Sequence, residues 1–247
     1  MSNWTDDSIS SLSAAEKIEL IQILELQSSR KKYNQIKTLF PDDGPLKRSL
    51  YPRHLEFFKA GATHRERLFM AGNRVGKTIA GGYECVCHMT GEYPDWWEGR
   101  RYDRPVKILA AGDTGQSTKD IIQEKMLGGK WGEDDWGTGL IPRDAMEKPV
   151  IKQGISGAYE EVKVRHVSGG LSTFKMRSYD QGRRIFQGFE LDVFWPDEEV
   201  PQDVYSEGLI RTMTTQGMVI MTFTPLNGLT PLVLDFMSTM ETQEALQ

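Results

Sequence analysis

The apolar residues of the chain follow two alternating patterns. Short apolar runs stand at residues 67–70, 106–112, 191–195 and 218–223, and such continuous runs are typical of buried strands in a parallel sheet. Helical patterns occupy residues 51–58, 78–89, 114–127, 204–214 and 231–246. This alternation predicts an α/β fold in which helices flank a mainly parallel central sheet.

A different strand pattern stands between the second and third runs. Residues 161–167 and 172–179 alternate with period two around Ser168, Gly169 and Gly170, which predicts a β-hairpin. Four basic residues at alternate positions would share one face of this hairpin: Lys163, Arg165, Lys175 and Arg177. Two interpretations remain open, a strip that faces DNA and the ordinary polar outer face of a ribbon.

The N-terminal segment carries its own helix signal. Ser13 and Glu16 form a capping-box pattern, and Leu20, Ile21 and Leu24 follow at helical spacing. We expect this helix to continue to about Phe40, before the break at residues 41–45. Residues 1–45 would then be a helical appendage and residues 46–247 the main domain. The appendage would either dock a partner or pack on the main domain.

Composition adds limits to this interpretation. The 247 residues are 38% hydrophobic and 26% charged, as in an ordinary globular protein, with no apolar run long enough to span a membrane. No signal peptide stands at the N-terminus. The net charge of −5 is unlike that of a protein coated for DNA binding, so any such contact must be a local basic patch. Cys85 and Cys87 are expected to be reduced.

A phosphate-binding loop follows the first apolar run. Its residues are Ala71, Gly72, Asn73, Arg74, Val75, Gly76, Lys77 and Thr78. The strand before it and the helix after it would direct backbone N–H groups at a phosphate. Lys77 would reach the β and γ phosphates of ATP, and Thr78 would place its hydroxyl on Mg²⁺. Gly76 would admit the phosphate closely, and Gly72 would supply any positive φ.

An acidic motif follows the run at 191–195. Asp197 would bind Mg²⁺ opposite Thr78, and Glu198 would activate a water molecule, so that the reaction is hydrolysis. Glu199 remains an alternative to Glu198 as the base. Because proline removes a ladder hydrogen bond, the strand must either pair on one side only at Pro196 or end there; we expect the sheet to end there, with Asp197 exposed.

The last apolar run ends in the sequence Met-Thr-Phe-Thr-Pro-Leu-Asn-Gly at 221–228. Hydroxyl groups at such a strand end would sense the γ-phosphate and couple its loss to movement. The equally weighted alternative is a plain strand end followed by a turn.

The three motifs together resemble the ATPase half of a large terminase subunit, the DNA-packaging motor of tailed double-stranded DNA bacteriophages and prophages. The resemblance covers about residues 51–231 and rests on Ala-Gly-Asn-Arg-Val-Gly-Lys-Thr, Phe-Glu-Leu-Asp-Val-Phe-Trp-Pro-Asp-Glu-Glu and the 221–228 sequence. It implies a P-loop NTPase fold with an added strand and a catalytic glutamate. It also implies an ATPase that packages double-stranded DNA into a procapsid in the host cytoplasm. The implied partners are a portal ring, a small terminase subunit and further copies in a homo-oligomeric ring, with no membrane.

The resemblance also assigns roles by position. Lys77 and Thr78 would bind phosphate and Mg²⁺, Asp197 would bind Mg²⁺, and Glu198 would activate water. Thr222 and Thr224 match the coupling motif, and Arg74 matches an arginine often found inside the phosphate loop. Tyr51 and His54 lie in the segment that resembles the adenine-recognition region, where a glutamine is common. Candidate arginine fingers are Arg74, Arg101, Arg183, Arg184 and Arg211.

Two other functions are compatible with the motifs. One is a helicase-like ATPase of repair or defence, which would need a second motor domain. The other is a nucleotide-binding assembly module that is inactive alone. Large terminases also carry a nuclease domain, and because the chain ends soon after the coupling motif, we expect no nuclease activity from it.

Overall fold

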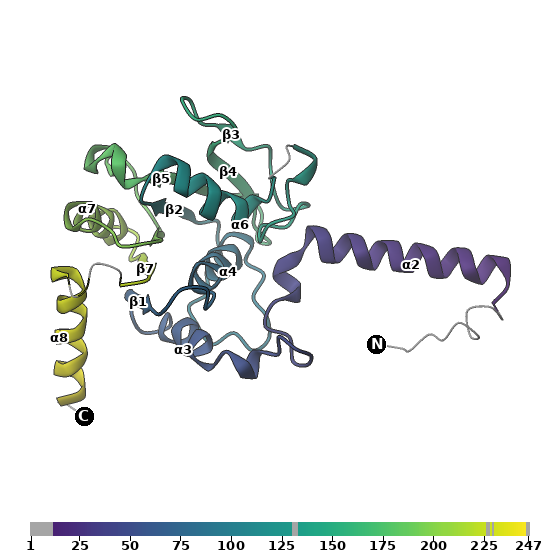
Figure 1. Ribbon diagram of the computed structural model, residues 1–247, viewed down its shortest axis with the longest axis horizontal. Coiled ribbons are helices and arrows are strands. Elements are labelled where there is room, and N and C mark those ends of the chain that lie inside the picture. The colour runs from purple at the N-terminus through teal and green to yellow at the C-terminus, as the bar shows by residue number, and fades with distance from the viewer. Residues whose placement is uncertain (1–11, 130–132, 226–227, 229, 246–247) are drawn as a thin grey trace.

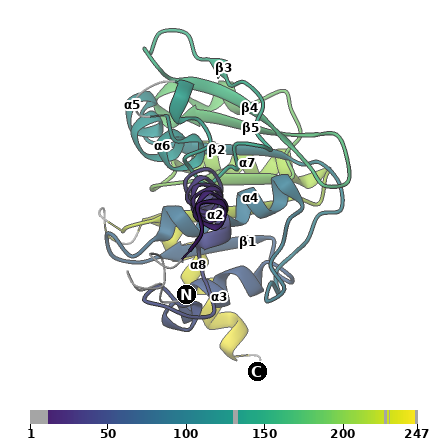
Figure 2. The same ribbon diagram turned by 90° about the vertical axis from the view of Figure 1, so that its right-hand side faces the viewer.

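The computed structural model describes residues 12–129, 133–225, 228 and 230–245. One seven-stranded sheet runs in the order β1-β7-β6-β2-β5-β4-β3 (Figures 1 and 2). Its strands are β1 Glu66–Met70, β2 Lys107–Gly112, β3 Val150–Ile151, β4 Tyr159–Arg165, β5 Leu171–Ser178, β6 Val193–Pro196 and β7 Met218–Phe223. The five strands from β1 to β5 in this order pair in parallel, and β4 and β3 add antiparallel pairs. The mainly parallel sheet and the hairpin are therefore confirmed.

The helices also follow the predicted order. They are α2 Ala14–Tyr33, α3 Pro52–Ala60, α4 Lys77–Thr90, α5 Gly115–Ser117, α6 Glu124–Leu127, α7 Gln202–Met213 and α8 Pro231–Ala245. A π-helical segment, Thr118–Gln123, joins α5 to α6, so residues 115–127 form one helical stretch capped by Thr114. Short 3₁₀ turns lie at Gln35–Thr38, Arg48–Leu50, Glu133–Asp135, Tyr179–Gln181 and Arg183–Phe186.

Alternate residues of the sheet supply two hydrophobic cores, one on each face. Helices α3, α4 and α6 pack on the face that carries Ile108, Trp195 and Ile220, whereas α7 and α8 pack on the face that carries Leu109 and Phe194. Two consecutive glycines bring α4 close to the sheet. A Cβ atom at Gly81 would lie 2.5 Å from the indole nitrogen of Trp195, so only glycine allows this approach. Both free cysteines are buried in this core.

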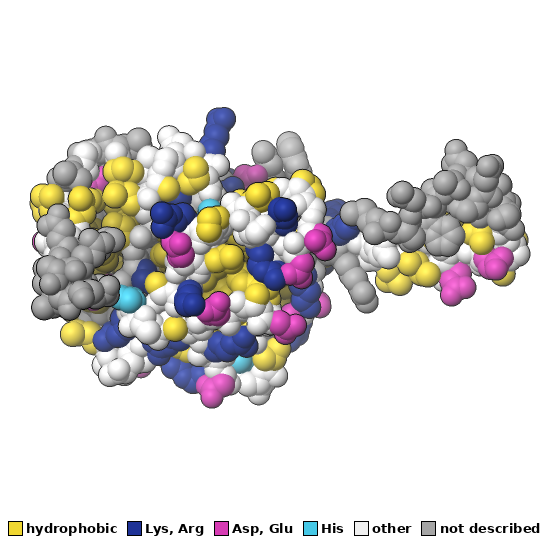
Figure 3. All heavy atoms as spheres, turned by 90° about the horizontal axis from the view of Figure 1, so that it is seen from below, with side chains coloured by type: hydrophobic (Ala, Val, Ile, Leu, Met, Phe, Trp, Pro, Cys, Tyr) yellow, Lys and Arg dark blue, Asp and Glu magenta, His cyan; other side chains and the backbone are white. Residues whose placement is uncertain are grey.

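The N-terminal helix α2 stands out from the body of the molecule (Figure 1). Ser13 and Glu16 form the predicted capping box. The helix ends at Tyr33 and does not reach Phe40, because Asn34 leaves the helical conformation, and Ile36 and Phe40 lie in the main core. Apolar side chains along α2 are exposed to solvent (Figure 3), namely Ile18, Ile21, Ile23, Leu24 and Leu26. Within the described residues, no helix is long and apolar enough to cross a membrane.

The sheet does not end at Pro196, contrary to our expectation. Strand β6 lies between β7 and β2, and it pairs with β2 through Pro196 but with β7 only at Val193 and Phe194. Pairing resumes directly afterwards, because Asp197 N–H donates to Ala111 and Glu198 N–H donates to Thr222. Proline therefore interrupts one ladder only, as the missing N–H requires, and the other ladder continues. Asp197 is consequently buried, with 2% exposure.

Candidate active site

The predicted phosphate loop connects β1 to the N-terminus of α4. Gly76 is the N-cap of α4 with a φ of 87°, and Arg74 has a φ of 62°. Gly72 has no positive φ, so our expectation for that residue was wrong, and a Cβ atom there would meet nothing within 4 Å. The residues with positive φ, Arg74 and Gly76, lie instead directly before α4, where the loop enters the helix. Arg74 is therefore a non-glycine residue held in a conformation that usually carries a strain cost.

His54 lies beside this loop, and Tyr51 packs on His54. The His54 ring packs edge-on against Phe69 and Tyr51, with centroid distances of 4.9 and 5.4 Å. A Cβ atom at Gly76 would lie 3.2 Å from Nε2 of His54. Burial lowers the pKa of His54, and polar contacts with the backbone of Val75 and Gly76 oppose this change. His54 thus supports the loop backbone as a mainly neutral ring.

The second motif meets the loop at Thr78. The Thr78 hydroxyl lies 3.0 and 3.1 Å from the two carboxylate oxygens of Asp197. Lys77, from the same turn, donates from Nζ to the carbonyl of Gly72 at 2.6 Å. Residues 119 positions apart therefore meet at the carboxyl ends of β1 and β6, the edge at which open α/β sheets bind their ligands.

Asp197 has the surroundings of a cation ligand. Burial raises the pKa of Asp197 to about 6, and the hydroxyls of Thr222 and Thr78 oppose this rise. It forms no ion pair with the described residues. Its carboxylate accepts from the hydroxyls of Thr78 and Thr222, and the charge of Lys77 also lowers its pKa. An oxygen donor set of one carboxylate and one hydroxyl fits Mg²⁺, which takes its other ligands from phosphate and water. No group of three His, Cys, Asp or Glu residues suited to a metal ion occurs among the residues that the structure describes.

Glu198 and Glu199 have different surroundings. Burial raises the pKa of Glu198, the charge of Lys77 opposes this rise, and Asp113 adds to it. Glu198 also has a φ of 74°, an uncommon value for a residue with a side chain. Glu199 lines a separate cavity of about 300 Å³ together with Pro201 and residues at the start of α8.

The third motif contacts both of the others. The Thr222 hydroxyl donates to Asp197 at 2.6 Å, and the Thr224 hydroxyl donates to Oδ1 of Asn73 in the phosphate loop at 2.8 Å. Strand β7 lies between β1 and β6, so its carboxyl end is placed to touch both strand ends. Leu226 and Asn227 of this motif lie outside the described residues.

Two supporting residues were missed by the sequence reasoning. The indole N–H of Trp195 donates to the Thr222 hydroxyl at 2.8 Å, deep in the core. The Tyr179 hydroxyl donates to the carbonyl of Ala111 at 2.9 Å and lies 3.2 Å from the carbonyl of Asp197. Only the Trp195 contact had a signal in the sequence, because a buried tryptophan directly before an acidic motif needs an acceptor for its N–H.

The five arginine candidates differ in their partners. Arg183 and Arg211 both pair with Glu207. Arg101 donates to the carbonyl of Trp97 and stacks on Tyr93. Arg74 and Arg184 form no ion pair with the described residues.

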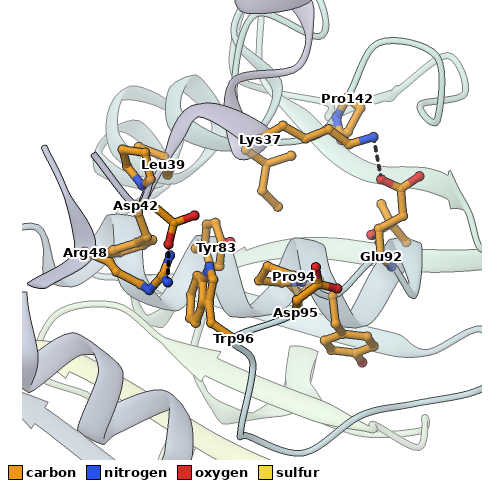
Figure 4. A pocket seen from close by; sticks show the side chains of 16 residues that line it. Lys37, Leu39, Asp42, Arg48, Tyr83, Glu92, Pro94, Asp95, Trp96 and Pro142 are labelled. Carbon is orange, nitrogen blue, oxygen red and sulfur yellow. Dashed lines mark hydrogen bonds and ion pairs between the residues drawn. The ribbon is translucent and has the colours of Figure 1, made fainter. Parts of the chain in front are cut away.

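A cavity of about 460 Å³ lies apart from this site, between the segment that follows α2 and the second half of α4 (Figure 4). Lys37 pairs with Glu92 at 2.9 Å, and Arg48 pairs with Asp42. None of the phosphate-loop residues or the carboxylates after β6 lines it. It is therefore not the candidate active site.

Comparisons with known proteins agree with the motifs. The family model described as "Terminase large subunit, T4likevirus-type, N-terminal" matches residues 68–246. The large terminase subunit of Salmonella phage P22 is 30% identical over 249 residues, which cover 94% of this chain and 48% of that protein. The chain thus spans about half the length of this curated relative.

Solved structures give weaker likenesses. The large terminase ATPase domain of Thermus phage P74-26 has a TM-score of 0.47 and 17% identity, over 70% of this chain and 63% of that one. The large terminase of the thermophilic bacteriophage D6E in complex with ATP-γ-S has a TM-score of 0.42 and 13% identity, over 70% of this chain and 36% of that one.

Proposed function

The chain belongs to the family of terminase large subunits, and we propose that it is the ATP-hydrolysing motor domain that drives double-stranded DNA into a procapsid. One observation carries this proposal. The Thr78 hydroxyl lies 3.0 Å from the buried carboxylate of Asp197, which unites a phosphate loop and an acidic strand end in one oxygen-rich site. Such a pair is the arrangement that P-loop NTPases use to hold Mg²⁺ on a nucleotide.

The binding roles follow from position. Lys77 and the backbone of residues 71–78 bind the phosphates of ATP, and Thr78 and Asp197 hold Mg²⁺, which neutralises phosphate charge when it is bound. His54 supports the loop backbone at Gly76, and Tyr51 packs on the His54 ring. Both residues belong to the proposed nucleotide-binding region.

Glu198 is the base that orients and activates the attacking water. Its half-buried carboxylate has a raised pKa, as a general base near neutral pH requires. The charge of Lys77 opposes this rise, as expected for a base placed near the phosphate-binding lysine. Glu199 lines another cavity and has no such role.

The charge of the transferring phosphate needs an arginine. Arg74 lies in the phosphate loop itself, with a positive φ directly before α4, and serves this site. Arg183 and Arg211 both pair with Glu207 and are poorer candidates.

Thr222 and Thr224 couple the chemistry to movement. Thr222 contacts Asp197 from β7, and Thr224, directly after β7, contacts Asn73, so two points at the end of β7 respond to the state of the nucleotide site. The double-stranded DNA, the portal ring, the small terminase subunit and the host cytoplasm complete the proposal, by analogy with the family.

Phosphate release tests this function. We would compare wild type, Glu198→Ala and Glu199→Ala, each with and without double-stranded DNA and procapsids. Glu198→Ala should lower turnover by about 10²–10⁴-fold while nucleotide binding persists, because a general base contributes about this much. Glu199→Ala should remain active. Equal turnover in wild type and Glu198→Ala would exclude this base. Nucleotide binding without phosphate release in wild type would favour an assembly module instead.

A further inference from the structure

On one face of the sheet, the side chains change from apolar to charged beyond β2. Over β6 and β7 this face is covered by α7. Leu109 of this face is in register with Lys175 of β5, and Ala111 is in register with Arg177. The apolar surface under α7 therefore continues as a charged surface on β5 and β4, which lie toward the far end of the sheet (Figure 2).

Two adjoining grooves follow this charged surface. One has a volume of about 690 Å³ and the other about 280 Å³, and both are lined by Lys175 and Phe189. We call them together the basic trough, which is defined by its six cationic side chains: Lys107, Lys152, Lys163, Lys175, Arg177 and Arg184. The predicted hairpin strip is thus divided, because Arg165 pairs with Glu147 at 2.8 Å and does not line the trough.

The trough holds more positive charge than its own carboxylates neutralise. Three acidic side chains line it, Glu160, Glu161 and Glu190, against six cationic ones, which leaves a surplus of three charges in a chain of net charge −5. The ion pairs within it are long, 3.6 Å from Lys175 to Glu161 and 3.5 Å from Arg177 to Glu160.

The remaining cations lack ion-pair partners. Lys107, Lys163 and Arg184 form no ion pair with the described residues. The ammonium group of Lys152 donates to the amide oxygen of Gln181 at 3.4 Å and forms no ion pair within the described part of the chain. Burial lowers the pKa of Lys152, and the charge of Arg177 lowers it further. The positive charges thus repel one another, and a bound anion would relieve this repulsion.

We propose that the basic trough binds the phosphate backbone of double-stranded DNA. The choice of DNA rests on the proposed function, whereas the anionic chemistry rests on the trough itself. Lys163 lies beside Thr173, and Arg177 follows four residues later, so the charges extend over about 13 Å of strand. This length equals about four nucleotides of one DNA strand.

The other lining groups fit a ligand that is held without reading its sequence. The amides of Gln153, Gln181 and Gln187 line the larger groove and can donate to phosphate oxygens. The ring of Phe189 lies 5.4 Å from the ammonium group of Lys175, so one face of this aromatic ring is covered. The trough therefore binds the phosphate backbone of DNA irrespective of base sequence, as a translocating motor requires.

Duplex binding at several salt concentrations tests the trough. The trough variant is Lys107→Gln, Lys152→Gln and Lys163→Gln together. Its matched control is Lys31→Gln, Lys47→Gln and Lys125→Gln, which removes the same charge from exposed sites outside the trough. The probe is a labelled duplex of random sequence, followed by fluorescence anisotropy from about 50 to about 200 mM salt.

We expect the trough variant to lose at least about tenfold in affinity at low salt. The slope of log affinity against log salt should fall by about 2–3, since each phosphate contact contributes about 0.9. The control should bind like wild type. A second variant with arginine at the same three lysines should restore binding, which separates lost charge from lost folding.

Nucleotide binding, measured on the same samples, separates the two proposals. If wild type and both variants bind MgATP but the trough variant also binds the duplex like the control, the trough is excluded and the motor proposal stands. If the trough variant loses binding to polyglutamate but not to the duplex, the partner is an acidic protein segment and our proposal is wrong. If wild type fails to bind MgATP, the proposed function fails, and duplex binding alone then decides the trough.

Discussion

Thr222 gives the sharpest test of the site, because its single hydroxyl serves two buried partners. It accepts from the indole N–H of Trp195 at 2.8 Å and donates to Asp197 at 2.6 Å. The tryptophan can only donate, so the direction of both bonds is fixed. We predict that Thr222→Val destabilises the protein more than Thr222→Ser, although valine has nearly the same shape as threonine.

The magnitude follows from what each substitution removes. In Thr222→Val, the indole N–H of a fully buried Trp195 loses its acceptor, at a cost of about 1–3 kcal/mol. The carboxylate of Asp197 also loses a hydroxyl donor, and a hydrogen bond to a charged group contributes about 1.5–3 kcal/mol. The sum is about 2.5–6 kcal/mol. In Thr222→Ser both bonds remain, and the loss of one buried methyl group costs only about 0.5–1.5 kcal/mol.

Equilibrium unfolding in urea, followed by circular dichroism without nucleotide, measures this difference. The two variants and wild type should have equal m-values, so that a shift in midpoint reports stability. The expected order of unfolding free energy is wild type, then serine, then valine. If the valine variant is as stable as the serine variant, the Trp195–Thr222–Asp197 chain does not hold the carboxylate as we argue.

Three further predictions follow. Lys77→Ala should abolish MgATP binding in a titration calorimeter, and retained affinity with unchanged Mg²⁺ dependence would contradict the phosphate-loop assignment. Arg74→Ala should lower phosphate release by about 10³–10⁵-fold, with the Glu207-paired Arg183→Ala as a milder control. Burial lowers the pKa of His88, and Glu84 opposes this, so its contribution to stability is present above about pH 6.5 and is lost as the pH falls through its folded pKa. Unfolding free energies from pH 7.5 to 5 should therefore fall more for wild type than for His88→Gln. The difference between the two proteins isolates this effect from the carboxylates after β6, whose raised pKa values act in the opposite direction.

Local sequence signals predicted the order of elements because their physical causes are local. Continuous apolar runs gave the parallel strands, and period-two alternation gave the β4–β5 hairpin. The phosphate loop needs only a strand, a glycine at Gly76 and a helix start, all of which stand within a few residues. The family resemblance drawn from these motifs is confirmed by the family model.

The features that sequence reasoning missed depend on contacts between distant segments. Pro196 lies in a central strand because β2 continues to pair with it on the side where no N–H is needed. Arg183 and Arg211 share Glu207 as their ion-pair partner. Nothing in the spacing between Arg183 and α7 predicts the pair between Arg183 and Glu207. Similarly, the positive φ of Arg74 instead of Gly72 is set by how the loop enters α4.

The trough and the nucleotide site are joined by one buried side chain. Arg177 of the trough stands two residues before Tyr179, whose ring lies at the end of β5. The Tyr179 hydroxyl donates to Ala111 and lies 3.2 and 3.4 Å from the carbonyls of Asp197 and Glu198. A displacement of the end of β5 therefore moves a group in direct contact with the backbone that carries both carboxylates. Such a contact is the physical requirement for a DNA-binding strand to influence hydrolysis, and it needs no large rearrangement of the sheet.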